Sequence, residues 1–314
     1  MCSKAIEPNA KRLKSVDISK RFPRAVLRYP GGKARILNLL TEFIPKYFDE
    51  YREPFVGGGA LFLWLLNTRP DARFWINDIN MDLMAFWSTL KSSGEKLAQE
   101  ASEMREKYSD GRDLYYRFKS LNVDDLGIFE RGLRFFILNR ITYSGLVDAG
   151  GYSKASFYER FTENSIENLR RVSPRLKNVK ITSGNYSSLL NAPSREVFLF
   201  VDPPYENAKS SKLYGKGGVN GINFDKDRLL ADLKECKGNW LLTYDKTDTI
   251  YKSYKEFASI DEKVVQYGTN FKSKEMSKKK PAKKGIELFI HNFEVEQVNQ
   301  SFLKRSNSRK RKIR

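Results

Sequence analysis

The stretch REPFVGGGALFLWLLNTRPDARFWIND, residues 52–78, decides the fold. Residues 52–56 are typical of a strand that ends at three glycines, residues 60–67 of a helix, and residues 74–78 of a second strand. This order predicts a Rossmann-like βαβ unit, in which glycines let the backbone approach a ligand closely. Asp78 follows Gly57 by about 20 residues, the spacing at which an acid binds ribose hydroxyls in such units.

The glycine loop departs from the dinucleotide-binding fingerprint G-x-G-x-x-G. Its last position is Phe62, which disfavours a nicotinamide-dependent dehydrogenase. The chain also has one histidine and two cysteines among 314 residues. These counts exclude a disulfide framework and zinc sites built from cysteine or histidine, and they disfavour a Ser-His-Asp triad.

The chain on either side of this unit is expected to continue the α/β pattern, interrupted by helices. Residues 34–44 predict a helix, and residues 81–172 are mostly helical, with an irregular glycine-containing stretch at 139–161. Further strands are predicted at 179–182, 197–201, 240–244 and 287–290, and a basic loop at 272–285. The predicted segments are a flexible basic arm at 1–24, a catalytic α/β domain at 25–88 and 177–296, a helical insert at 89–176, and a basic tail at 297–314.

The charge of the chain favours a polyanionic partner. There are 57 lysines and arginines against 38 acids, a net charge of +19. Such an excess is typical of proteins that neutralise phosphates, although a solvated surface is the alternative. Seven of the last eleven residues are basic, so we expect the tail to add affinity for phosphates. No segment has the sequence of a membrane span or a secretory signal, and we expect a cytoplasmic protein.

Asp202-Pro203-Pro204-Tyr205 carries the most specific chemistry. It follows the apolar strand at 197–201, at the end where open α/β sheets place their sites. A turn that merely ends the strand is the alternative. A carboxylate and the rigid carbonyl of Pro203 can each accept one N–H bond of a planar amino group. Tyr205 can stack on a base, and a sulfonium methyl group would suit the reaction because it needs neither metal nor histidine.

Four motifs then occur in a fixed order: Tyr29-Pro30-Gly31-Gly32-Lys33, Pro54-Phe55-Val56-Gly57-Gly58-Gly59, Asn77-Asp78-Ile79-Asn80 and Asp202-Pro203-Pro204-Tyr205. In this order they resemble the Dam-like (D12-class, alpha-group) DNA adenine N6-methyltransferases, over roughly residues 25–293. The resemblance implies a Rossmann-like methyltransferase sheet with a helical target-recognition insert. It also implies S-adenosylmethionine as the methyl donor and double-stranded DNA as the substrate.

The resemblance assigns roles to single residues. The catalytic residues would be Asp202, Pro203 and Tyr205. The residues that bind the cofactor would be Tyr29, Lys33, Phe55, Gly57, Asp78, Asn185 and Asp202. The residues that contact DNA would be Asn139, Arg140, Tyr143 and Asp148, and no metal ligands are expected.

Three positions depart from the family pattern. Tyr29 stands where some relatives have tryptophan. Asn185 stands where many relatives have an acid, although its amide oxygen can still accept from the cofactor's adenine amino group. Asp148 stands where GATC-specific relatives have an arginine. An aspartate cannot donate to guanine and can instead accept from cytosine N4, which argues against GATC as the target.

Adenine N6-methylation of duplex DNA, with the adenine flipped out, is the leading interpretation. Methylation of cytosine N4 or of RNA is the alternative within the same chemistry, and a non-catalytic basic DNA-binding protein is the alternative outside it. We expect a monomer that acts on the nucleoid. The sequence leaves open whether a cognate restriction endonuclease accompanies it.

Overall fold

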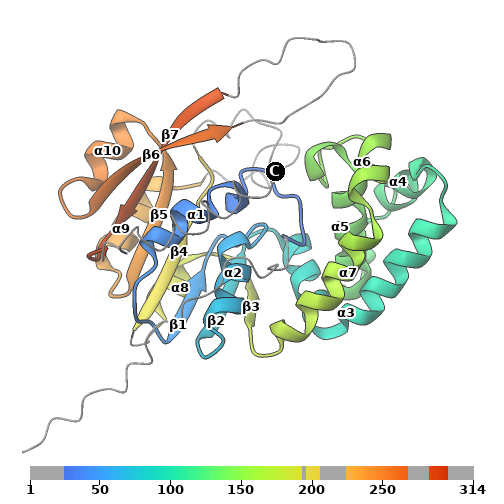
Figure 1. The fold of residues 1–314 in the computed structure, drawn as a ribbon, viewed down its shortest axis with the longest axis horizontal. Helices are drawn as coiled ribbons and strands as arrows, with labels where there is room; N and C mark the ends of the chain where they lie inside the picture. Colours follow the sequence, from blue (N-terminus) through green and yellow to red (C-terminus); the bar gives the residue numbers. More distant parts are fainter. Residues whose placement is uncertain (1–24, 193–195, 206–223, 268–282, 296–314) are drawn as a thin grey trace, which may run out of the picture.

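The computed structural model describes residues 25–192, 196–205, 224–267 and 283–295. These residues form a seven-stranded sheet in the order β3-β2-β1-β4-β5-β7-β6 (Figure 1). Its strands are β1 (Glu50–Glu53), β2 (Arg73–Asp78), β3 (Lys180–Ser183), β4 (Val197–Val201), β5 (Asn239–Asp245), β6 (Ser259–Tyr267) and β7 (Lys283–His291). Strands β1 to β5 are parallel, and β7 runs antiparallel between β5 and β6. The predicted α/β, Rossmann-like sheet is confirmed.

The strand order reverses between β1 and β4. From β1 the chain proceeds to β2 and β3 on one side, whereas β4 and β5 follow on the other. Open α/β sheets bind ligands at such a switch point, outside the carboxyl ends of the strands. The residues that follow β1 and β4 therefore converge at one edge of the sheet.

Strand β4 is apolar because both of its faces are covered. Phe198 and Phe200 pack in the same core as α2 (Ala60–Thr68), whereas Leu199 and Val201 pack with α9 (Lys226–Glu235) and α10 (Asp248–Tyr254). A parallel strand between two helical layers reads as a continuous apolar run, and all five residues of β4 are buried. The motif that follows β4 is thus attached to a rigid element.

Five α-helices lie between β2 and β3 and gather beside the sheet in Figure 1. They are α3 (Met81–Lys107), α4 (Arg112–Lys119), α5 (Ile128–Ile141), α6 (Lys154–Arg160) and α7 (Glu163–Val172). Phe86 of α3 stacks on Phe136 of α5, with ring centroids 6.0 Å apart. Helix α3 continues through residue 88 and is kinked at Ser93, so the division between catalytic domain and insert stays a prediction.

Two elements near the start of the described chain differ from expectation. The helix predicted at 34–44 is divided into η1 (Lys33–Arg35), α1 (Leu37–Leu40) and η2 (Thr41–Phe43), because the backbone of Ile36 leaves the helical region. The strand predicted at 52–56 lies earlier, at Glu50–Glu53. Pro54 follows it and has no N–H to continue the hydrogen-bonded ladder.

Other differences lie further along the chain. The stretch predicted as irregular at 139–161 contains the end of α5 and all of α6. Strand β6 was missed because its sequence, SIDEKVVQY, is rich in charge, which edge strands of a sheet tolerate. The helices α8 (Ser187–Asn191), α9 and α10 were not predicted either.

Some predictions fall on residues that the structure does not describe. The basic loop predicted at 272–285 overlaps β7 from residue 283, and its residues 272–282 lie outside the described chain. The arm at 1–24 and the tail at 297–314 lie outside it as well. Within the described residues, no helix combines the length and hydrophobicity that a bilayer span requires.

Candidate active site

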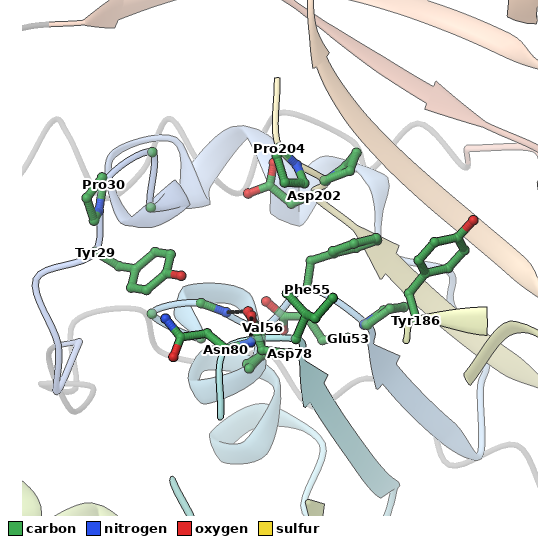
Figure 2. Close-up of a pocket in the computed structure, with 18 of the residues that line it drawn as sticks. Tyr29, Pro30, Glu53, Phe55, Val56, Asp78, Asn80, Tyr186, Asp202 and Pro204 are labelled. Carbon is green, nitrogen blue, oxygen red and sulfur yellow. Dashed lines mark hydrogen bonds between the residues drawn. The ribbon is translucent and has the colours of Figure 1, made fainter. Parts of the chain in front are cut away.

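A pocket of about 340 Å³ opens at the carboxyl ends of β1, β2 and β4. Residues that follow these strands line it, together with the segment 29–33 and the segment 145–149 that follows α5. In Figure 2, Asp202 and Pro204 lie on one side of the pocket and Asp78 and Asn80 on the other. The predicted site residues brought together here are Tyr29, Lys33, Phe55, Gly57, Asp78, Asp148, Asn185, Asp202, Pro203 and Tyr205.

The two oxygens of the Asp202 carboxylate have different surroundings. Oδ1 accepts from Lys33 Nζ at 2.6 Å, from Thr243 Oγ1 at 2.9 Å and from Tyr205 Oη at 3.2 Å. Oδ2 has no hydrogen-bond donor among the described residues. One oxygen therefore anchors the side chain, and the other can accept from a ligand.

Lys33 is a buried cation between two carboxylates. Its side chain is 8% exposed, and Nζ lies 3.4 Å from Glu287 Oε1 in addition to its contact with Asp202. Burial lowers the pKa of Lys33, but the charges of Asp202 and Glu287 outweigh it, so the pKa is raised. Lys33 therefore carries its positive charge at neutral pH.

Tyr205 is held at its hydroxyl as well as its ring. Oη lies 2.7 Å from Glu287 Oε1, and the ring lies against Tyr244 at a centroid distance of 5.5 Å. The ammonium of Lys33 lies 4.8 Å from the ring centroid. Burial raises the pKa of Tyr205 well above its usual value, and the carboxylates of Asp202 and Glu287 add to this rise. The hydroxyl is therefore a donor.

Asp78 is fixed by the backbone of the glycine loop. Its Oδ2 accepts from Gly57 N and its Oδ1 from Asn80 N, both at 3.0 Å. Burial raises the pKa of Asp78 to about 6, although the backbone N–H groups of Asn80, Gly57 and Ile79 oppose the shift. Gly57 has φ +45°, and a Cβ there would lie 2.9 Å from the ring of Tyr29. Only glycine allows this close approach without strain.

Two buried acids in or beside the pocket were not predicted as functional. Glu53, at the end of β1, lines the pocket, and Tyr51 Oη donates to it at 2.5 Å. Burial raises the pKa of Glu53 well above its usual value. Glu287 belongs to β7 and joins Lys33 to Tyr205. Each acid lies in or next to a predicted strand of the sheet, where charged side chains are rare. That position is the feature of the sequence that could have indicated a functional role.

Aromatic rings form another wall of the pocket. The ring of Phe55 lies 5.3 Å from that of Tyr186 and 5.6 Å from that of Phe224. Asn185 lies beside them, and its Oδ1 accepts from Ser187 N at 2.9 Å. An amide oxygen has a second lone pair, so the expected bond to a cofactor adenine stays a prediction.

Asn139 and Arg140 are buried at the end of α5. Asn139 is fully buried and forms hydrogen bonds with the backbone N and O of Arg28. Arg140 is buried as well and donates to the backbone oxygen of Val26. Burial, with the nearby charges of Arg28 and Arg160, lowers the pKa of Arg140 to about 9. Both side chains hold the segment before Tyr29 against α5, and their expected contacts to DNA stay predictions.

Tyr143 and Asp148 are placed differently from these two residues. Tyr143 is 55% exposed directly after α5, away from the pocket lining. Asp148 is exposed at the rim of the pocket, and Lys119 Nζ donates to its backbone oxygen at 2.8 Å. Their contacts to DNA stay predictions.

The sequence profile of a family described as D12 class N6 adenine-specific DNA methyltransferase matches residues 29–269. The chain is 33% identical to the Type II methyltransferase M.MjaIII of Methanocaldococcus jannaschii over 224 residues, which cover 65% of this chain and 77% of that protein. It is also similar to DNA adenine methylases of Vibrio cholerae serotype O1 (28% identity over 223 residues) and of Escherichia coli K12 (26% over 222). Both alignments cover 68% of this chain and 76% of the relative.

Proposed function

Because the chain belongs to the family of D12 class N6 adenine-specific DNA methyltransferases, we propose that it transfers the methyl group of S-adenosylmethionine to the N6 amino group of an adenine in duplex DNA. The adenine would leave the helix and enter the pocket, since its amino group is out of reach inside a base pair. Adenine methylation of DNA follows from the family itself. The donor, the flipped base and the roles of single residues are what we propose.

The unequal surroundings of the two Asp202 oxygens carry this proposal. With Oδ1 anchored by Lys33, Thr243 and Tyr205, Oδ2 can accept one N–H bond of the target amino group. The carbonyl of Pro203 can accept the other. These acceptors turn the nitrogen lone pair out of the plane of the base, toward the methyl donor. Both are held before the substrate arrives, so little reorganisation is needed during the reaction.

The pocket residues fit S-adenosylmethionine, which would supply an electrophilic sulfonium methyl group. Asp78 can accept from the ribose hydroxyls, and the carboxyl of Glu53 can accept a hydrogen bond from the ammonium group. Phe55 and Tyr186 offer rings to the adenine of the cofactor. A Cβ at Gly184 would meet no atom within 4 Å, so this wall has room for a ligand.

The charge and the surface residues support double-stranded DNA as the partner. The net charge of +19 favours binding to phosphates. Tyr143 would contact the DNA where the adenine leaves the helix, Asp148 would read a neighbouring base, and Tyr205 would stack on the flipped adenine. We propose a monomer. The Type II name of M.MjaIII supports a cognate restriction endonuclease as a further partner.

A labelled-methyl assay tests the proposed function. The protein is incubated with duplex DNA and with S-adenosylmethionine carrying a labelled methyl group, and the DNA is then hydrolysed to nucleosides. The label is expected on N6 of deoxyadenosine. Label on cytosine, or label only on RNA, would support the alternative substrates. Cofactor binding without any transfer to nucleic acid would contradict the proposal.

The affinity for S-adenosylmethionine should fall as the pH is lowered, because the carboxylate of Asp78 becomes protonated. Ribose hydroxyls donate hydrogen bonds, so they need the carboxylate form, whereas protonation converts one oxygen into a donor. With a pKa of about 6 in the empty pocket, lowering the pH from 8 to 5 should weaken cofactor binding about tenfold. Calorimetry measures this directly. Asp78→Asn should bind more weakly and lose the pH dependence between pH 5 and 8, whereas DNA affinity without cofactor should not change.

Asp148 should contribute to sequence selectivity. Its exposed position at the pocket rim lets it accept from a base edge, so Asp148→Ala should relax preference at one base pair by about 1–3 kcal/mol. The measurement is the methylation rate on all single-base variants of the target site. Asp124→Ala, an exposed aspartate of the same helical region, is the control. Equal profiles for the two variants would refute the role.

A further inference from the structure

Glu287 is an acid whose side chain is buried within the sheet. It belongs to β7, where it pairs with Asp245 of β5 and Lys263 of β6. Glu287 is only 1% exposed. The residues after it, Leu288, Phe289 and Ile290, are buried and apolar. Burying a carboxylate is costly unless it is paired, and an apolar residue would serve a sheet core equally well. A role beyond packing is therefore expected for this side chain.

Glu287 binds the same two groups that anchor Asp202. Its Oε1 lies 2.7 Å from Tyr205 Oη and 3.4 Å from Lys33 Nζ. These donors lie 3.2 Å and 2.6 Å from Asp202 Oδ1. Among the described residues, Tyr205 and Lys33 connect Glu287 to Asp202, and Glu287 limits the movement of both.

We propose that Glu287 is a positioning residue for methyl transfer: it fixes Tyr205 and Lys33, and it shares the charge of Lys33 so that this lysine does not neutralise Asp202 alone. This inference rests on the proposed function of the site. Positive charge develops on the amino nitrogen as the new bond to the methyl carbon forms. A carboxylate that keeps more of its negative charge stabilises that state more than the ground state, so the benefit appears in the rate.

Glu287→Gln separates charge from shape. The amide keeps an oxygen that can accept from Tyr205, but the negative charge beside Lys33 is lost. The single-turnover rate of methyl transfer should fall about 10- to 100-fold, as for a group that orients a reacting residue. Affinities for DNA and S-adenosylmethionine should not change. The matched control is Glu262→Gln on the neighbouring strand β6, where the glutamate is 39% exposed and paired with Lys246. Its rate should equal that of the parent.

The pH dependence of the rate distinguishes this role from a merely structural one. In the described part of the chain, the charged groups that face Lys33 are Asp202 and Glu287, with the hydroxyl of Tyr205 beside them. Both carboxylates raise the pKa of Lys33, so loss of one should move the alkaline limb of the rate profile to lower pH. A variant that only loosens the fold would lower the rate at every pH without moving this limb. Glu287→Gln and Tyr205→Phe should also combine non-additively.

The outcomes separate this inference from the proposed function. A Glu287→Gln rate equal to that of the parent, or a lower rate with an unmoved alkaline limb, overturns the positioning role even if adenine is methylated. Label on cytosine overturns the proposed function instead, and the Glu287 comparison is then made on that substrate. A reduced rate with a shifted limb and unchanged affinities supports the inference.

Discussion

Asp202→Ala is expected to lower the single-turnover rate of methyl transfer by about 10²–10³-fold, the typical effect of removing one preorganised polar group. The carboxylate orients the target amino group through Oδ2 and offsets the positive charge that develops on its nitrogen. An interaction that strengthens in the transition state contributes to rate more than to affinity. DNA affinity should hold or rise slightly, because one negative charge near the phosphates is removed.

The structure predicts that Asp202→Ala leaves a folded protein. Lys33 keeps its contact with Glu287, and Tyr205 keeps its hydrogen bond to the same acid. Asp227→Ala, at the exposed start of α9, removes an equal charge elsewhere and should leave the rate unchanged. A rate for Asp202→Ala within about tenfold of the parent, a barrier change of only ~1.4 kcal/mol, would refute the assigned role.

Lys33→Met is expected to destabilise the protein by about 3–5 kcal/mol, as for removal of one partner from a buried ion pair. Lys33 lies 2.6 Å from Asp202 and 3.4 Å from Glu287. Without it, Asp202 and Glu287 lose the cation that the described residues place between them. The free energy of unfolding in urea measures the effect. Methyl transfer should also slow, since Asp202 loses its shortest hydrogen bond.

Lys246→Met provides a matched comparison for Lys33→Met. Lys246 makes an equally short contact with Glu262, at 2.6 Å, but both side chains are more than a third exposed. An exposed pair contributes less than about 1 kcal/mol. Adding Glu287→Gln to Lys33→Met should recover part of the lost stability, because one of the facing charges disappears. Equal destabilisation by the two lysine substitutions would contradict this account of the site.

The sequence alone determined the parts of the molecule that depend on the order of neighbouring residues along the chain. The run VFLFV predicted β4, because a strand buried on both faces must be apolar throughout. The glycines after β1 and the acid at the end of β2 predicted that Gly57 and Asp78 belong to one cofactor site, and both line the same pocket, because parallel strands end at the same edge of the sheet. The four ordered motifs were sufficient to identify the family, and the matched region contains all of them.

Only the tertiary structure determined which side chains form hydrogen bonds with Asp202 and which side chains are buried. Lys33 and Asp202 are 169 residues apart in sequence, and Glu287 comes from a strand added antiparallel beyond β5. The family resemblance placed Lys33 and Asp202 in one site, but no local spacing relates either of them to Glu287, so the contacts among the three could not be predicted. Asn139 resembled a DNA contact by sequence, yet packing directs it to the backbone of Arg28. A motif identifies which residue types are present, whereas burial and long-range contacts determine what each can reach.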